Sequence, residues 1–212
     1  MRIVSVEPLI DKGGFSGTKE WQIIYDHITK AIKAVDWPPG SGSFTLYPQC
    51  GKKPGERNGI APIKKACMQH LKSFGWVLER PCDVVTVKKS WKVDACFPVS
   101  ERFFGLEWPT GNSLSSHGVV NKMTLGMLER VLIGGVLIVP SYEMHRYLTD
   151  RVGHLAEIRP YFRVWRSIRV DEGLLAVIAV EHDAVSTQVP RIPKVTDTIV
   201  SRQTRRPGLS PA

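Results

Sequence analysis

The stretch Trp91-Lys92-Val93-Asp94-Ala95-Cys96-Phe97 decides the fold, together with Phe103-Phe104-Gly105-Leu106-Glu107-Trp108, which follows after a short turn. In the first segment apolar residues alternate with others, which places Trp91, Val93, Ala95 and Phe97 on one face of a strand. Lys92, Asp94 and Cys96 are then expected on the opposite face. A hairpin centred on Ser100 and Glu101 sets Asp94 directly opposite Glu107, with their Cβ atoms about 5 Å apart.

Two carboxylates that face each other on a sheet destabilise it unless a cation lies between them. Hard divalent ions take oxygen ligands, and Mg²⁺ is commonly held by one or two carboxylates together with phosphate oxygens. In a basic protein this pair indicates metal-assisted hydrolysis of phosphodiesters. The alternative is that Asp94 and Glu107 point into solvent and meet nearby lysines or arginines, since structural ion pairs are commoner than metal sites.

The composition favours polyanionic partners. The chain has 212 residues, a formal net charge of +9 and 42% hydrophobic residues, enough for one sizeable core. Its isoelectric point is about 9.5, so DNA, RNA and anionic membranes are all candidate partners. Four scattered cysteines indicate reduced thiols. The longest apolar stretch, 131–140, contains two glycines and is too short to span a bilayer, so we expect a cytoplasmic protein without a membrane partner.

The apolar periodicity predicts strands that alternate with helices, which is typical of an α/β sandwich around a mixed sheet. We expect one domain over 1–195 and a flexible basic tail over 196–212. Thr18 can cap the first helix, Pro62 suits the start of the second and Gly75 its end. The expected helices are 19–35, 62–74, 116–133 and a helical stretch 143–158 that stops at Pro160; the expected strands are 44–47, 83–87, 91–97, 103–108, 136–139 and 173–180.

Several blocks along the chain resemble BamHI-type type II restriction endonucleases. They occur in the order found in that family and cover roughly residues 58 to 195. Tyr147-Leu148-Thr149-Asp150-Arg151-Val152 is the most specific of them. The others are Asn58-Gly59-Ile60-Ala61-Pro62-Ile63-Lys64, Trp76-Val77-Leu78-Glu79-Arg80-Pro81, Val93-Asp94, Leu106-Glu107-Trp108, Thr110-Gly111-Asn112, Ser115-Ser116-His117, Asn121-Lys122, Pro160-Tyr161-Phe162 and Val189-Pro190-Arg191-Ile192-Pro193-Lys194.

The resemblance implies a homodimeric, Mg²⁺-dependent nuclease with a PD-(D/E)xK-like core: a central mixed β-sheet flanked by helices. Such an enzyme cuts duplex DNA at a palindromic, GGATCC-like site and is matched by a cognate DNA methyltransferase. Asp94 and Glu107 match the metal ligands, and Glu79 matches a supporting acid. The dimer contact is expected along 116–133 and around 143–147, where Met123, Met127 and Leu128 supply apolar surface unless they lie in the monomer core.

The resemblance also assigns residues that bind DNA. Asp150 and Arg151 match readers of cytosine and guanine edges in the major groove, and an acid accepting from cytosine and an arginine donating to guanine fit the groove chemistry. The alternative for these two residues is the start of a helix capped by Thr149. The remaining DNA-binding matches are Lys64, Asn112, Ser115 and His117.

Three positions depart from the family pattern. Pro109 stands where the family has an acid two residues after the second ligand, Leu114 where it has a serine, and Gly118 where it has a guanine-reading arginine. Two hypotheses follow: a working endonuclease with a rearranged active site, or a DNA-binding homologue with impaired catalysis. A basic RNA-binding or structural module ranks last, because the chain lacks the aromatic, glycine-rich segment of RNA-recognition modules.

Lys92 is the candidate that could restore a working site. The same hairpin register places Lys92 opposite Pro109 and on the face of Asp94. In many related nucleases a lysine beside the second acid orients water and stabilises the charge that develops on phosphate. The competing interpretation is a solvated surface lysine at Lys92 and an inactivating change at Pro109.

Overall fold

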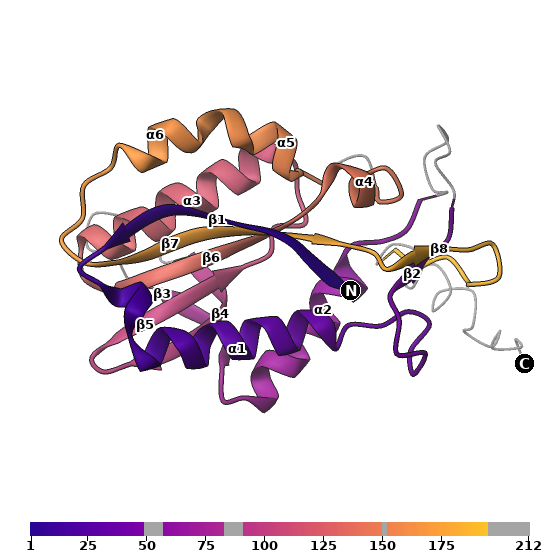
Figure 1. Cartoon of the computed structure of the whole chain (residues 1–212), viewed down its shortest axis with the longest axis horizontal. Helices are drawn as coiled ribbons and strands as arrows, with labels where there is room; N and C mark the ends of the chain where they lie inside the picture. The colour runs from indigo at the N-terminus through magenta and orange to yellow at the C-terminus, as the bar shows by residue number, and fades with distance from the viewer. Residues whose placement is uncertain (49–56, 83–90, 150–151, 195–212) are drawn as a thin grey trace, which may run out of the picture.

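The computed structural model describes residues 1–48, 57–82, 91–149 and 152–194 of the chain. Helices and strands alternate along these residues, as Figure 1 shows. The strands are β1 (Arg2–Lys12), β2 (Thr45–Leu46), β3 (Val77–Cys82), β4 (Trp91–Val99), β5 (Arg102–Glu107), β6 (Leu132–Pro140), β7 (Gly173–Glu181) and β8 (Ala184–Val185). The helices are η1 (Phe15–Gly17), α1 (Lys19–Lys33), α2 (Ala61–Ser73), α3 (Ser113–Leu128), α4 (Tyr142–His145), α5 (Leu155–Ile158), η2 (Arg159–Tyr161) and α6 (Phe162–Arg166).

The described strands form a central mixed sheet in the order β1-β7-β6-β5-β4-β3, beside a small pair of β2 and β8. β5, β6 and β7 run parallel to one another, whereas β1, β4 and β3 pair antiparallel with their neighbours. β6 is buried along its whole length, which accounts for its continuous apolar sequence. The expected α/β fold with a mixed sheet flanked by helices is confirmed.

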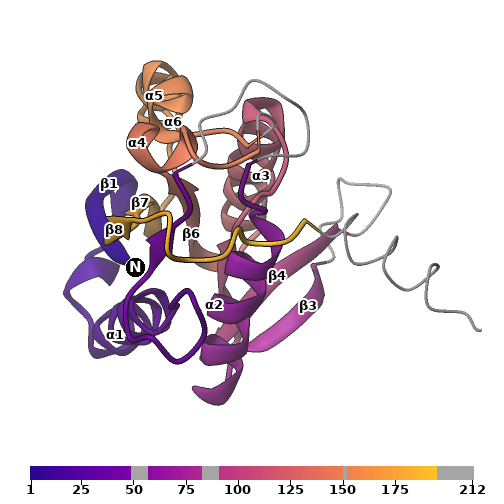
Figure 2. The same cartoon turned by 90° about the vertical axis from the view of Figure 1, so that its right-hand side faces the viewer.

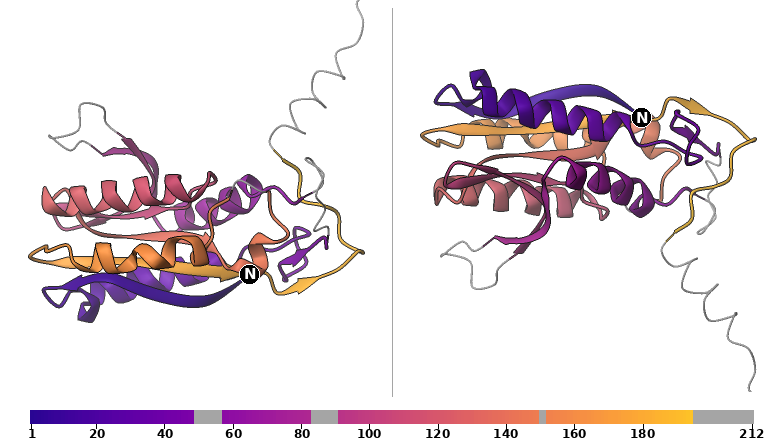
Figure 3. Two further views of the ribbon diagram at one scale, coloured as in Figure 1. Left: turned by 90° about the horizontal axis from the view of Figure 1, so that it is seen from above. Right: turned by 90° about the horizontal axis from the view of Figure 1, so that it is seen from below.

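Each face of the sheet carries its own hydrophobic core. On one face, Ile24, Ile28 and Ile32 of α1 and Ile63, Cys67 and Leu71 of α2 pack on the sheet. On the other face the sheet is covered by Val120, Met123 and Met127 of α3 and by Phe162 and Trp165 of α6. Figure 3 shows this layering: α3, α5 and α6 lie over the sheet from above, and α1 and α2 from below. The sheet is therefore the middle layer of three.

The helix caps agree with the local sequence. The backbone N–H of Trp21 donates to the Thr18 hydroxyl at 3.2 Å, so Thr18 caps α1 as expected. After α2, Gly75 has a φ of 86°, the left-handed conformation that glycine adopts at lowest cost. Asn112 caps α3 by accepting from the N–H of Ser115.

Some expected element boundaries are wrong. The third long helix begins at Ser113 and ends at Leu128, not at 116 and 133, because Arg130 adopts a φ of 57° and Leu132 already belongs to β6. The stretch 143–158 is not one helix but two short ones, and helical turns continue past Pro160 because proline is tolerated in a first turn. β1 and β3 had not been expected as strands, and the expected strand 83–87 lies outside the described residues.

Asn58 ties three distant segments together at one end of the molecule. Its side-chain amide donates to the carbonyls of Tyr47 and Tyr147, both at 3.0 Å, and its carbonyl accepts from the N–H of Ile192 at 3.0 Å. Asn58 and Ile192 are fully buried. Gly59 follows so closely that a Cβ there would lie 2.4 Å from the carbonyl oxygen of Pro193. This end of the sheet is therefore held by hydrogen bonds in addition to apolar packing.

Among the described helices, none has the length and apolar character needed to cross a membrane.

Candidate active site

The β4–β5 hairpin has the expected register. Ala95 pairs with Leu106, Cys96 with Gly105 and Phe97 with Phe104. One step beyond the first of these pairs lie Asp94 and Glu107, which are 9% and 7% exposed. The two carboxyl groups are close enough to share a hydrogen bond. The prediction that these acids face each other is therefore confirmed by the geometry, and they lie buried rather than in solvent.

The expected assignment of faces along β4 is wrong. Val93 packs in the core under α3, whereas Ala95 packs in the core under α1 and α2. Residues two apart in a regular strand share a face, so β4 changes face at Asp94. In the neighbouring strand β3, Leu78 pairs with Ala95 and Arg80 with Val93, and Glu79 between them has a φ of 53°. This irregularity of both strands means that Asp94 cannot be assigned to a face by simple alternation.

Both oxygens of Asp94 accept hydrogen bonds. Oδ2 accepts from the backbone N–H of Trp108 at 2.8 Å. Oδ1 accepts from Nζ of Lys64 in α2 at 2.6 Å. The carboxylate is thereby fixed between the end of β5 and a helix on one side of the sheet. Figure 2, seen from this end of the molecule, shows α2 and α3 next to β4.

Glu107 is held in an unfavourable environment for a charged carboxylate. Burial, as the largest cause, and the charge and hydrogen bond of Asp94 together raise its pKa to about 9. Lys64 and Lys122 act in the opposite direction. Two lysines therefore do not compensate the two acids, and an additional positive charge between the acids would stabilise both in their ionised forms.

This donor set fits a hard divalent cation. Such ions favour carboxylate oxygens and neutralise like charges that otherwise repel. Within the described ranges, no group of three or more His, Cys, Asp or Glu side chains is placed to share a metal ion. Asp94 and Glu107 would thus hold a cation as a pair, which is typical of Mg²⁺ with its remaining positions taken by water and phosphate oxygens.

Glu79 lies in register beside Asp94, between the paired residues of β3. Its side chain is exposed, in contrast to the buried acids, and its left-handed φ is unusual for a residue with a side chain. Such strain is often found at functional sites. The structure therefore brings Glu79 to the neighbourhood of the pair but turns it toward solvent.

Lys92 does not lie opposite Pro109 in the sheet. β5 ends at Glu107, because the N–H of Trp108 bonds to the Asp94 side chain instead of continuing the ladder. Lys92 pairs instead with Pro81 of β3, and its side chain is exposed. The lysine in contact with Asp94 is Lys64, which the sequence had suggested only as a DNA-binding residue. The helical spacing of Ile63, Cys67 and Leu71 places Lys64 beside the buried face of α2, but only the docking of that helix brings it to the acid.

The expected DNA-binding residues of α3 lie along its first turn. Asn112 and Ser115 are exposed and bonded to each other through the cap of the helix. His117 is partly buried against Tyr161 and Trp165, with ring centroids 4.3 and 5.5 Å away, so it packs α3 against the helices that follow. Asp150 and Arg151 lie outside the described residues.

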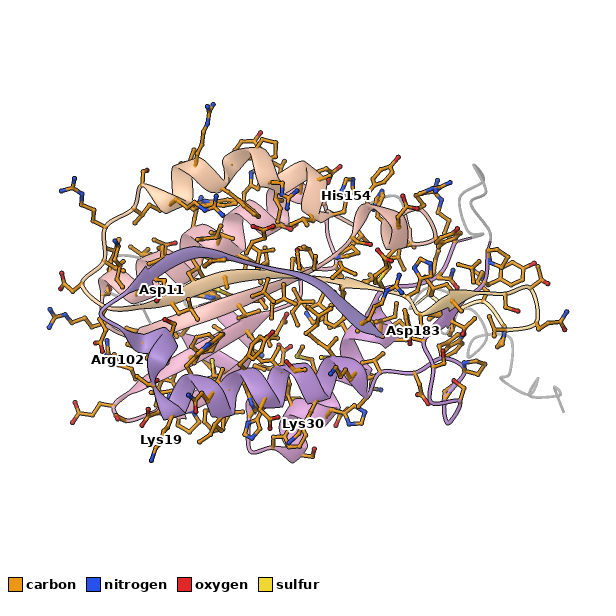
Figure 4. All side chains as sticks on the ribbon, viewed as in Figure 1. Asp11, Lys19, Lys30, Arg102, His154 and Asp183 are labelled. Atoms are coloured by element: carbon orange, nitrogen blue, oxygen red, sulfur yellow. The ribbon has the colours of Figure 1, made fainter. Side chains whose placement is uncertain are left out.

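The described residues that flank positions 150 and 151 are firmly attached. The N–H of Gly153 donates to the carbonyl of Gly111 at 2.9 Å, and a Cβ on Gly153 would lie 2.9 Å from Ser113. Leu148 is fully buried and accepts from the Arg57 guanidinium. His154, labelled in Figure 4, packs against His145 with ring centroids 4.4 Å apart. Gly153 is therefore anchored next to the first turn of α3, and Leu148 next to Arg57 and Asn58.

The model of the family described as restriction endonuclease BamHI matches residues 1–198 of this chain. The chain belongs to the BamHI restriction endonuclease family. Members of this family are nucleases, so the protein is an enzyme of the hydrolase class. The resemblance noted from the sequence is confirmed.

Two relatives support the same conclusion, and one solved structure supports the fold. The chain is 46% identical to the type II restriction enzyme OkrAI of Oceanobacter kriegii over 197 residues, covering 93% of this chain and 97% of that one. It is 29% identical to the type II restriction enzyme BamHI of Bacillus amyloliquefaciens over 193 residues, covering 87% and 86%. The crystal structure of restriction endonuclease BglII with a DNA 16-mer matches with a TM-score of 0.57 and 10% identity, covering 91% and 88%, which concerns the fold alone.

Proposed function

We propose that this enzyme cuts duplex DNA at a palindromic, GGATCC-like site in a Mg²⁺-dependent reaction. The observation that carries the proposal is the pair of buried carboxylates, Asp94 and Glu107, at the open end of the β4–β5 hairpin. The raised pKa of Glu107 supports a cation between them, because burial and the neighbouring acid both oppose its charge. Membership of a family of restriction endonucleases supplies the reaction class.

When bound, Mg²⁺ would polarise the scissile phosphate and make a bound water more acidic. The chain's own residues prepare that site. The N–H of Trp108 fixes the orientation of Asp94, and Glu107 at the end of β5 supplies the second carboxylate. Glu79 is proposed as a supporting acid at the exposed rim, next to Asp94 in register.

Contacts to DNA are proposed for the residues that surround this end of the sheet. Asp150 and Arg151 would read base edges, and Asn112, Ser115 and His117 at the start of α3 would also contact the DNA. Lys64 would contact the DNA at the same end of the sheet. The net charge of +9 favours binding to the phosphate backbone and makes the affinity depend strongly on salt.

We propose a homodimer on this palindrome, because a two-fold interface places identical subunits on identical half-sites. Exposed apolar side chains support a contact on the side of α3 and α6: Leu114 and Leu128 of α3, Tyr142 of α4, Tyr161 of η2 and Val164 of α6. Met123 and Met127 are buried in the monomer core, so the expectation that they supply interface surface is wrong.

As a restriction enzyme the protein would act in the cytoplasm beside a cognate DNA methyltransferase that protects the host site. The proposal is tested by incubating purified protein with unmethylated plasmid and Mg²⁺ and sequencing the ends that form. Cleavage at one palindromic sequence, abolished by EDTA, is expected. Tight binding of duplex DNA without cleavage would instead favour an impaired homologue, for which the replacement of the family's acid by Pro109 is the supporting observation.

A further inference from the structure

We propose that Lys64 supplies the positive charge beside the scissile phosphate in this enzyme, from helix α2 rather than from the strand that carries the second acid. The inference rests on the proposed function. It differs from the resemblance, which suggests only a DNA contact for Lys64, and from the expectation that Lys92 takes this place. Lys64 would therefore be a catalytic residue for phosphodiester hydrolysis.

The first support is position. Nζ of Lys64 lies 2.6 Å from Oδ1 of Asp94, and the Lys64 side chain is 23% exposed. Lys64 lies in the first turns of α2, between the buried residue Ile63 and the core-facing Cys67. Since α2 is packed on the sheet through Ile63, Cys67 and Leu71, the ammonium is held by a rigid element.

The second support is that Lys64 acts on both acids. Its charge partly opposes the rise of the Glu107 pKa, in addition to its direct bond with Asp94. Lys122 of α3 also affects Glu107, but it is exposed on the opposite side of the sheet. Lys92 is exposed and lies beside β3, beyond the point at which β4 changes face. Lys64 thus bonds directly to Asp94 and interacts electrostatically with Glu107.

The third support is chemical. An ammonium has three N–H donors, and one of them occupies Asp94 Oδ1 in this structure. The other two can donate to a non-bridging phosphate oxygen and to the attacking water. In hydrolysis the water oxygen bonds to phosphorus and the bond from phosphorus to the leaving sugar oxygen breaks. The water gives one proton to solvent and the sugar oxygen takes one from solvent, so Lys64 keeps its charge and stabilises the developing negative charge.

This role accounts for a tolerated proline at position 109. In the family pattern an acid stands at this position, two residues after the second metal ligand, and its carboxylate can act as a base. An ammonium placed from α2 at Asp94 would supply a polar group to the site without an acid at position 109, and the Trp108 N–H that precedes it is already bonded to Asp94. The active site would be rearranged by moving its third polar group from a strand to a helix.

The test compares wild type with Lys64→Met, which removes the charge and keeps most of the volume. Lys65→Met is the matched control, because Lys65 lies next to it in α2 but is exposed. Single-turnover cleavage with saturating enzyme and Mg²⁺ should fall about 100-fold for Lys64→Met, as when one charge-stabilising donor is lost. Duplex binding in Ca²⁺ should change much less, and Lys65→Met should cleave like wild type.

A second readout does not depend on cleavage. Calorimetric titration of the DNA-free protein with Mn²⁺ should show tighter binding for Lys64→Met than for wild type, because the ammonium competes with the metal for Asp94. Lys64→Cys, converted to an aminoethyl side chain by bromoethylamine, should regain part of the cleavage rate. The described cysteines Cys67, Cys82 and Cys96 are buried, and wild type treated in the same way is the control for reaction at Cys50.

Four results would overturn the proposal. Cleavage by Lys64→Met at the wild-type rate does so, as does a loss that is fully explained by weaker duplex binding, which would make Lys64 a DNA contact only. Loss in Lys92→Met with no loss in Lys64→Met would assign the role to Lys92. A folded wild type that binds DNA but cuts no duplex with Mg²⁺ or Mn²⁺ overturns the proposed function as well, and is recognised by the inert wild type itself.

Discussion

The two ends of the β4–β5 hairpin carry the same kinds of charged groups in opposite settings. At the turn, Arg102 bonds to Glu172 at 2.7 Å, and nearby Arg130 bonds to Asp171 at 3.0 Å. Arg102 is labelled at one end of the sheet in Figure 4. The side chains of Arg130 and Asp171 are 77% and 87% exposed. At the open end, Asp94 and Glu107 are buried side by side and share Lys64.

Burial distinguishes the candidate reaction centre at the open end from the structural ion pairs at the turn. In water, opposite charges pair weakly and each acid keeps its own partner. Under the cover of α2 and α3, two acids repel each other and lose hydration, so their charge depends on what else binds there. The charge of Glu107 at the open end should therefore depend on a bound cation, whereas Arg130 and Asp171 at the turn form an ion pair in water.

The largest effect is expected at Asp94. Asp94→Ala and Asp94→Asn should reduce Mg²⁺-dependent cleavage by at least about 1,000-fold, because a metal ligand is lost. Binding of duplex DNA should be retained or strengthened, since a negative charge near the phosphates is removed. Gel-based cleavage and fluorescence anisotropy measure the two properties. Glu172→Gln at the turn is the control, and undiminished cutting by either Asp94 variant, or by wild type in excess EDTA, would contradict the assignment.

The next effect concerns how the free energy of unfolding of the metal-free protein depends on pH. The folded pKa of Glu107, about 9, lies above its unfolded value of 4.5. Between these values the folded chain holds a proton that the unfolded chain has released, so stability should fall as pH rises, by up to about 1.4 kcal/mol per pH unit.

Urea denaturation in EDTA at pH 5.5 to 8.5 measures this slope. In Glu107→Gln the slope should be much smaller, and the variant should exceed wild type in stability at the alkaline end. Mg²⁺ should raise the melting temperature of wild type at pH 8 but not that of the variant. A wild-type protein that grows more stable with pH in EDTA would refute the raised pKa.

A smaller effect is expected from the hydrogen bonds that hold this end of the sheet. Asn58→Ala leaves the carbonyl of Tyr47 and the N–H of Ile192 without their side-chain partner, whereas the carbonyl of Tyr147 keeps the backbone N–H of residue 58. Each unsatisfied buried group costs about 1–3 kcal/mol, and partial rearrangement limits the total to about 3 kcal/mol. Chemical denaturation measures this loss. A change below about 0.5 kcal/mol would mean that water replaces Asn58 at little cost.

The smallest effect is expected at the turn. Arg130→Ala removes an ion pair between two highly exposed side chains, so the free energy of unfolding should change by less than about 0.5 kcal/mol. The same denaturation experiment in low and high salt checks this prediction. A large, salt-sensitive loss of unfolding free energy would show that the turn end depends on its charges as much as the open end does.

The sequence by itself determined the family, the α/β class and the hairpin register that sets Asp94 opposite Glu107. These features are local or ordered along the chain: alternating apolar residues, a turn at Ser100 and Glu101, and blocks in a fixed order. Strand pairing across a short turn follows from these signals because the loop fixes which residues meet.

The tertiary structure decided which lysine meets the acids and which face each residue of β4 occupies. Helical spacing places Lys64 beside the core-facing side of α2, but its 2.6 Å contact with Asp94 depends on how α2 docks on a sheet 30 residues further along the chain. The change of face at Asp94 occurs beside Glu79 of the neighbouring strand, which has a φ of 53°. Such contacts arise from packing between elements distant in sequence, and periodicity within one element carries no information about them.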